Sequence, residues 1–276
     1  MPLSLRNAFR SLRHSPRFVI LAVAILSLGI GTTTAMFSMT RTVLLKPLAY
    51  RDPGRLATLL FRVPQFAKNV STIPVNAQHY LLWRDHSRTL EELGLVVQDS
   101  HILTGAGSAE QISGTRVTAN FLQMLGVQPL LGRNFSPGED QPGRNQVIIV
   151  SYEFWRTRLS GRRDPLGRKL LLDGQPFEVI GVMPPGLPFP SGRQLSDVVV
   201  LPSHTEYWTP LVFTKDQLGS PLGDFDFVAI GRLKPGVSAQ QVVSDLTALE
   251  KVIAKRSPRA SRNHSCSALP PSRHGP

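Results

Sequence analysis

The stretch from Val147 to Val182, VIIVSYEFWRTRLSGRRDPLGRKLLLDGQPFEVIGV, decides the fold class. Its first four residues, Val147–Val150, are all β-branched and apolar, which is typical of a buried strand. Ser151 follows directly and is a good N-cap, so a helix is predicted to begin there. Apolar side chains at helical spacing support this helix, namely Phe154, Trp155 and Leu159. A strand that leads into a helix in this way predicts a mixed α/β domain.

The second half of the same stretch predicts a β-hairpin. Leu170–Leu172 and Pro176–Val182 flank the dipeptide Asp173-Gly174, which suits a two-residue turn with positive φ. The next segment, residues 183–190, reads MPPGLPFP, and its prolines and glycine exclude regular structure. We interpret this segment as a connection between two subdomains.

Strands and helices alternate on both sides of this centre. Further strands are predicted at residues 56–63, 93–103, 111–118 and 225–233. One helix is predicted to open at Pro74 and to carry Tyr80 and Trp83, and a short one covers residues 119–125 and stops at Gly126. Ser238 and Gln241 form a capping box for a last helix, in which Val242, Leu246, Leu249 and Ile253 line one face. The fold class is therefore predicted as α+β, with two mixed α/β lobes.

A long uncharged run stands near the start of the chain. Phe18–Thr40 contains 23 residues without a charged side chain. As a helix it extends over roughly 34 Å, compared with about 30 Å for the hydrocarbon core of a bilayer. Residues 18–40 are therefore predicted to be a transmembrane helix. The alternative is a cleaved signal peptide with its processing site near Ala35, but the uncharged run continues beyond that point.

The segment before this run, residues 1–17, carries four arginines and no acidic residue. Positive flanks of a first membrane helix tend to remain in the cytoplasm, so the rest of the chain is predicted to lie outside the membrane. Leu5, Phe9 and Leu12 recur at helical spacing, which favours an amphipathic arm lying on the inner leaflet. The alternative is a positive flank that sets the topology and has no defined structure.

The charge of the chain is concentrated at its two ends. The formal charge is +12, of which residues 1–17 contribute +4 and residues 251–276 contribute +6. The intervening body carries only +2, whereas a nucleic-acid-binding surface places its basic residues on the folded body. The composition therefore excludes nucleic acid as a partner. Cys266 is the only cysteine, so neither a disulfide framework nor a cysteine-based metal site is predicted.

Residues capable of chemistry are present but not in a catalytic arrangement. His79 and His86 are seven positions apart with Asp85 between them, whereas a zinc site needs at least three ligands. The acidic pairs Asp224/Asp226 and Glu139/Asp140 have no histidine, serine or lysine placed to work with them. No phosphate-binding loop of the form GxxxxGK[ST] occurs in the sequence. The sequence therefore predicts no enzyme activity, no catalytic, metal or cofactor-binding residues, and no cofactor.

The last segment, residues 257–276, reads SPRASRNHSCSALPPSRHGP. It is rich in proline and serine, has no acidic residue and shows no hydrophobic periodicity. Such a composition predicts a disordered tail.

Five stretches in order along the chain resemble MacB-type ABC transporter permeases, also called FtsX-like permeases, including the orphan permeases of acidobacteria. They are LRNAFRSLRHSPRFVILAVAILSLGIG (5–31), VLLKPLAYRDPGRL (43–56), RVTANFLQMLGVQPLLGRNFSPGED (116–140), VSYEFWRTRLSGRRDPLGRKLLLDGQPFEVIGVMPP (150–185) and AIGRLKPGVSAQQV (229–242). The resemblance implies a MacB-like periplasmic core domain over residues 41–256, with a middle lobe inserted at approximately 119–195. It also implies a protein of the bacterial inner membrane whose main domain is periplasmic. Since no second apolar run in this sequence is long enough to cross a membrane, the chain is predicted to be single-pass.

The resemblance further implies a non-catalytic permease component that couples a separate cytoplasmic ABC ATPase to the external domain. The lipid bilayer and a second permease protomer are the other implied partners. Where the family has further membrane helices, this sequence has the tail at 257–276, so we interpret it as the N-terminal portion of a truncated permease. The alternative function is a membrane-anchored periplasmic binding or scaffold module without transport.

Overall fold

The computed structural model describes residues 25–27, 29–30, 50–62, 72–105, 108–159, 161, 164–187, 189, 204–219, 225–256 and 265–269. The chain divides into two units, Met1–Pro47 and Leu48–Pro276. In the first unit residues 25–27 and 29–30 are helical, with Ile25, Leu26 and Ile30 exposed. The predicted arm (1–17) and most of the predicted membrane helix (18–40) lie outside the described residues. Within the described residues, no helix is long and apolar enough to cross a bilayer.

The second unit is built on one mixed sheet, with the strand order β11-β1-β10-β3-β4-β9-β6-β8-β5 among the described residues. In addition, β2 pairs with β1, and β7 pairs with both β3 and β8. The pairs β4/β9 and β6/β8 are parallel, and the other pairs are antiparallel. The strands are β1 (Leu56–Arg62), β2 (Thr72–Ile73), β3 (Leu90–Thr104), β4 (Glu110–Val117), β5 (Leu131–Gly132), β6 (Val147–Val150), β7 (Lys169–Leu172), β8 (Gln175–Val182), β9 (Tyr207–Pro210), β10 (Val228–Leu233) and β11 (Ser265–Leu269).

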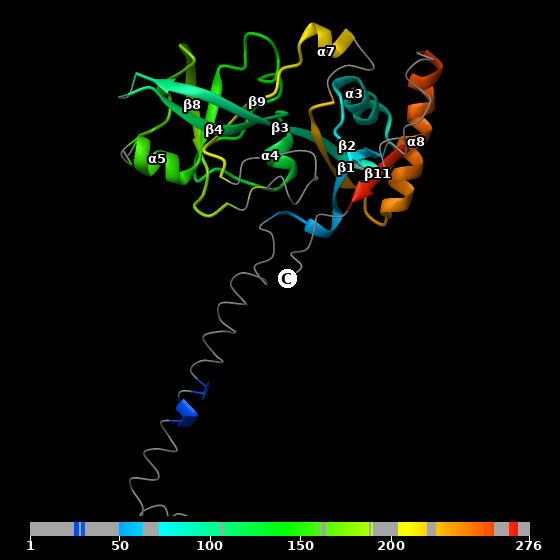
Figure 1. Cartoon of the computed structure of the whole chain (residues 1–276), viewed down its shortest axis with the longest axis horizontal. Helices are drawn as coiled ribbons and strands as arrows, with labels where there is room; N and C mark the ends of the chain where they lie inside the picture. The colour runs from blue at the N-terminus through cyan, green and yellow to red at the C-terminus, as the bar shows by residue number, and fades with distance from the viewer. Residues whose placement is uncertain are drawn as a thin grey trace, which may run out of the picture. The chain divides into compact units, whose positions relative to one another are not determined.

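Strand β3 connects the two ends of this sheet. It is 15 residues long, and its first half pairs with β10 while its second half pairs with β4 and, at the tip, with β7. Figure 1 shows β3 running from the end of the unit that carries α3 (Ala77–His86) and α8 (Ala239–Arg256) to the end that carries α5 (Tyr152–Arg158). The predicted mixed α/β domain is confirmed. The boundaries of the inserted lobe, 119–195, stay a prediction, since the strands of that segment continue the same sheet.

Within the described ranges the buried side chains form three clusters along the sheet. One lies between β1, β10 and the helices α3 and α8, and includes Phe61, Trp83 and Val242. A second surrounds the short helix α4 (Phe121–Met124). The third lies between β6, β8 and α5, and includes Ile148 and Phe154. The remaining short helices are the 3-10 helix η1 (Pro53–Arg55) and α7 (Lys215–Gly219).

The local signals in the sequence predicted several elements correctly. Ser151 is the N-cap of α5 and accepts a hydrogen bond from the backbone N–H of Phe154. Asp173 and Gly174 both have positive φ, 47° and 76°, and form the turn of the β7–β8 hairpin. The helix predicted to open at Pro74 instead begins at Ala77, because the side chain of Asn76 caps it by accepting a bond from the His79 N–H.

The prediction of disorder over residues 257–276 is wrong at Ser265–Leu269. These residues form β11, antiparallel to β1, with Thr58 opposite Leu269 and Arg62 opposite Ser265. The physical reason lies in β1, whose residues 56–61 are all buried. A buried strand needs partners for its backbone N–H and C=O groups on both edges, and a segment of modest hydrophobicity can supply them through its own backbone. The other residues of the predicted tail lie outside the described part of the chain.

Candidate functional site

The two histidines considered as metal ligands have separate surroundings. His79 is buried, with Nε2 3.0 Å from Oε2 of Glu250 and Nδ1 hydrogen-bonded to the Asn76 side chain. His86 is exposed at the end of α3. No group of three or more His, Cys, Asp or Glu side chains in the described part of the chain is placed to hold a metal ion. His79 instead helps to join α3 to α8.

The acidic pairs considered for catalysis have structural or peripheral positions. Glu139 forms an ion pair with Arg133 at 2.7 Å and accepts a hydrogen bond from the Ser136 N–H at 2.8 Å, which fixes a loop. Partial burial raises the pKa of Glu139, but the bonds from Arg133 and Ser136 outweigh it and leave the pKa below its usual value. Asp226 is exposed, and Asp224 lies outside the described residues.

A charged cluster that the sequence did not reveal joins β3 to the β7–β8 hairpin. Nε2 of His101 lies 2.9 Å from Asp99, and its Nδ1 lies 2.5 Å from Asp173 at the hairpin turn. The hydroxyl of Tyr207 donates to Asp99 at 3.3 Å, and Arg116 lies 3.4 Å from the same carboxylate. The bonds to Asp99 and then Asp173 raise the pKa of His101, and the bond from His101 lowers the pKa of Asp173.

The sequence indicated the proximity of only two members of this cluster, Asp99 and His101. Asp99 and His101 are two positions apart on a predicted strand, so their side chains share a face. Asp173 reaches them only because β7 pairs with the tip of β3, a contact over 72 residues of sequence. The cluster holds an imidazole between two carboxylates, which suits a structural ion bridge rather than a converging metal or catalytic site.

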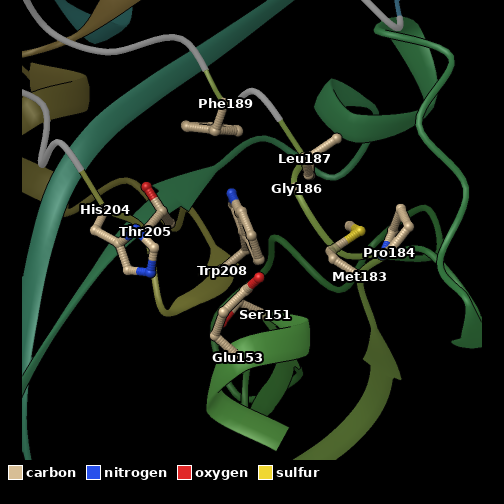
Figure 2. Close-up of a pocket in the computed structure, with 10 residues that line it drawn as sticks. All are labelled: Ser151, Glu153, Met183, Pro184, Gly186, Leu187, Phe189, His204, Thr205 and Trp208. Atoms are coloured by element: carbon tan, nitrogen blue, oxygen red, sulfur yellow. The ribbon is translucent and has the colours of Figure 1, made fainter. Parts of the chain in front are cut away.

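A small pocket lies beyond the carboxyl ends of the parallel strands β6 and β8. Ser151 follows β6, Met183 follows β8, and His204 and Thr205 precede β9 at the same edge. Figure 2 shows these side chains around Trp208 of β9, with the Phe189 ring next to the indole. The cavity has a volume of about 90 Å³. The other lining residues are Glu153, Pro184, Gly186 and Leu187.

The chemistry of this pocket is that of binding. Its polar atoms are the hydroxyls of Ser151 and Thr205, the carboxylate of Glu153, and the rings of His204 and Trp208. Ser151 accepts the hydrogen bond that caps α5, so its oxygen is committed to the helix. The lining residues therefore present hydrogen-bonding groups beside the apolar side chains of Met183, Leu187 and Phe189.

One mixed sheet with α3 and α8 packed at one end defines a mixed α/β domain. More specifically, residues 19–249 match the MacB-like periplasmic core domain family, and the chain belongs to that family. No curated protein gives a sequence match.

Solved structures with the same fold include three domains of bacterial proteins. A domain of a permease protein from Porphyromonas gingivalis has a TM-score of 0.60 and 18% identity, covering 82% of this chain and 95% of that chain. The periplasmic region of MacB from Actinobacillus actinomycetemcomitans has a TM-score of 0.53 and 13% identity, covering 78% of this chain and 88% of that chain. The extracellular domain of the noncanonic ABC-type transporter YknZ from Gram-positive bacteria has a TM-score of 0.51 and 16% identity, covering 78% of this chain and 99% of that chain. At these identities the likeness shows the fold alone.

Proposed function

We propose that this chain is a non-catalytic component of a MacB/FtsX-type permease, in which a partner ATPase on the cytoplasmic side drives movement of the external domain. Family membership over residues 19–249 supports the assignment to permeases. In this proposal residues 1–17 are the cytoplasmic arm, 18–40 a membrane helix and 41–256 the core domain in the periplasm. The bilayer, the ATPase and a second permease protomer are its partners.

The observation that carries the coupling proposal is the pairing of β1 with β11. The chain enters the domain through β1, which begins at Leu56 shortly after the proposed membrane helix, and the antiparallel strand β11 brings Leu269 back beside Thr58. Strand β1 is also paired to β10 along its other edge, from Leu56 to Leu59. A displacement applied at the start of β1 is therefore passed through a ladder of hydrogen bonds to the sheet and not to a loose loop.

The burial of β1 also favours the transfer of a displacement from this strand to the sheet. Leu59, Leu60 and Phe61 are each no more than 1% exposed, so the strand cannot slide without disrupting the core packed on its two faces. Tyr50 and Arg51, just before β1, are also held, because the Arg51 N–H donates to the Leu125 carbonyl at 2.9 Å and Tyr50 is buried. The start of the domain is thus attached to both the sheet and the α4 region.

A second candidate function is a membrane-anchored periplasmic binding or scaffold module without transport. The pocket around Trp208 favours it, because a binding module needs a concave site with hydrogen-bonding groups. The two functions differ in whether the external domain responds to ATP on the other side of the membrane.

Cys266 supplies a reporter for this difference, since it is the only cysteine in the sequence and lies on β11 opposite Phe61. The rate at which a membrane-permeant maleimide labels Cys266 is measured in native inside-out vesicles with ATP, with a non-hydrolysable analogue and without nucleotide. Coupling predicts a labelling rate that changes with ATP hydrolysis. The matched control is a Cys266→Ser, Asp216→Cys variant, which moves the thiol to the exposed surface of α7 and is expected to show no ATP dependence. A Cys266 rate that is the same in all three conditions contradicts coupling and favours the scaffold.

A further inference from the structure

The pocket around Trp208 lies where the topology of the sheet leaves an open edge. Strands β6 and β8 are parallel and end together at Val150 and Val182. In mixed and parallel sheets, ligands bind preferentially beyond the carboxyl ends of such strands, because the chain must turn away there and leaves a crevice. Strand β9 runs antiparallel to β6, so the residues that precede it border the same crevice. Three strand ends thus meet around one cavity of about 90 Å³.

The indole N–H of Trp208 is a hydrogen-bond donor without an acceptor. Trp208 is only 2% exposed, and its Nε1 has no hydrogen-bond partner among the described residues. In Figure 2 the nitrogen lies on the side of the indole that faces Phe189, and the two ring centroids are 5.5 Å apart with an interplanar angle of 65°. An aromatic face is a weak acceptor, so this buried donor is unsatisfied, and a polar group that enters the pocket and displaces Phe189 can accept its hydrogen bond.

The other walls define what such a group must look like. Met183, Leu187 and Phe189 supply apolar surface, which fits a short aliphatic body. The Ser151 oxygen already accepts the bond from the Phe154 N–H at 3.0 Å, so its own O–H remains available as a second donor. The Glu153 carboxylate also lines the pocket at its solvent-exposed side, and its negative charge disfavours an anion there.

We infer that this pocket binds a small neutral organic group that combines a short aliphatic body with a carbonyl or hydroxyl oxygen, and that this oxygen accepts the hydrogen bond of the Trp208 indole. The site is independent of the coupling proposed above. A volume of about 90 Å³ holds several water molecules, and therefore a molecule the size of a C4 amide.

The test uses three compounds with the same branched C4 body. Isobutyramide is neutral and has an acceptor oxygen, and isobutyrate is anionic. Isobutylamine is cationic and has no acceptor oxygen. The full chain in lipid nanodiscs carries 5-fluorotryptophan, so that Trp83, Trp155 and Trp208 each give a fluorine NMR signal. The Trp208 signal is assigned as the one that disappears in Trp208→Phe. Isobutyramide is expected to shift this signal in a saturable way, with millimolar affinity as is usual for so small a ligand.

Two variants and one control variant separate the proposed site from non-specific binding, with affinity measured by ligand-observed NMR. Trp208→Phe keeps the aromatic ring but removes the donor, and should weaken isobutyramide binding by roughly three- to tenfold. Glu153→Gln should bring isobutyrate binding close to that of isobutyramide. Trp155→Phe alters a tryptophan outside the lining residues and should leave isobutyramide affinity unchanged.

The proposal is overturned if isobutyramide leaves the Trp208 signal unmoved, or if Trp208→Phe binds isobutyramide as tightly as the native chain. It is also overturned if isobutyrate binds the native chain as well as the amide does. A thermal melt of each variant shows that the domain remains folded, so a loss of binding reports on the pocket.

Discussion

The indole nitrogen of Trp83 on α3 donates a 2.6 Å hydrogen bond to Oε1 of Glu250 on α8, across 167 residues of sequence. The second carboxylate oxygen of Glu250 lies 3.0 Å from Nε2 of His79, one turn earlier on α3. All three side chains are buried. A buried donor that loses its acceptor retains the cost of its desolvation, so this carboxylate determines how the two helices pack against each other.

Replacement of Glu250 by alanine is therefore expected to destabilise the domain by about 2–4 kcal/mol, because it leaves buried partners on α3 without an acceptor. In a domain of this size the midpoint of thermal unfolding falls by roughly 2–4 °C for each kcal/mol. Glu250→Gln keeps an acceptor oxygen for Trp83 and should cost less. Asp216→Ala, on the exposed surface of α7, is the control and should change stability by no more than about 0.5 kcal/mol. Equal midpoints for Glu250→Ala and the control would show that the carboxylate does not hold α8.

The β7–β8 turn depends on glycine at position 174, where φ is 76°. Gly174→Val places a β-branched residue in that conformation and should cost about 1–3 kcal/mol through backbone strain. A Cβ at Gly174 meets no atom within 4 Å, so steric contact does not contribute. Gly54 is equally open but lacks positive φ, and Gly54→Ala is the matched control. Urea unfolding of both variants tests the prediction, which fails if valine at 174 is tolerated as well as alanine at 54.

The charged cluster at the hairpin predicts a pH dependence of stability. The pKa of His101 is raised above 6.5 by its bonds to Asp99 and Asp173, so the stabilisation from the protonated ring is complete below about pH 6.5 and is lost as the pH rises through the folded-state pKa. The pKa of Asp173 is lowered below 3.8 by the bond from His101, so its contribution is lost only in strong acid. Arg116 and Tyr207 also face Asp99.

The measurement is the urea midpoint of the native chain and of His101→Gln from about pH 5.5 to 8.5, the range in which histidine titrates. The native midpoint should fall relative to the variant as the pH rises, and the two curves should converge at the alkaline end. If the difference between the two urea midpoints is constant over this pH range, the His101 ring is not charged in the folded protein. Asp216→Asn, which removes an exposed carboxylate on α7, should leave the pH dependence of the native chain unchanged.

The pairing of β11 with β1 predicts that residues 257–269 are needed for the stability of the domain. A chain ending at Arg256 lacks the partner of β1 at Thr58–Arg62, so it exposes the edge of a buried strand and should unfold at lower temperature and associate. A chain ending at Leu269 keeps the pairing and is the matched control. Differential scanning fluorimetry and light scattering compare the two. Identical behaviour of both truncations would contradict the pairing of β11 with β1.

The sequence predicted those parts of the fold that depend on neighbouring residues. The β7–β8 turn follows from Asp173-Gly174, and the start of α8 follows from Ser238 and Gln241, whose side chains exchange hydrogen bonds with each other's backbone N–H. In each case the residues that determine the conformation are within a few positions of one another, so their chemistry is visible in the sequence.

Contacts between distant segments were not predicted, and they include the polar clusters around Glu250 and around His101. Glu250 appeared as an ordinary helix residue, since its role depends on α3 packing against α8. Residues 265–269 show little hydrophobic periodicity. An edge strand pairs through its backbone hydrogen bonds, so the pairing does not require an apolar pattern of side chains. The pocket around Trp208 was missed for the same reason: Ser151, Met183 and Trp208 come together only when β6, β8 and β9 are adjacent in the sheet.

The central claim, that a membrane helix at 18–40 anchors an external permease domain, is tested most directly by topology. Alkaline phosphatase or green fluorescent protein is fused after Pro276, with and without the substitution Leu26→Arg, which costs roughly 2.5–3.5 kcal/mol of insertion free energy. The account predicts an active phosphatase fusion, a dark fluorescent fusion and retention in carbonate-washed membranes, all reduced by Leu26→Arg. A fluorescent fusion with inactive phosphatase, or a soluble external product that begins near Met36, would contradict it.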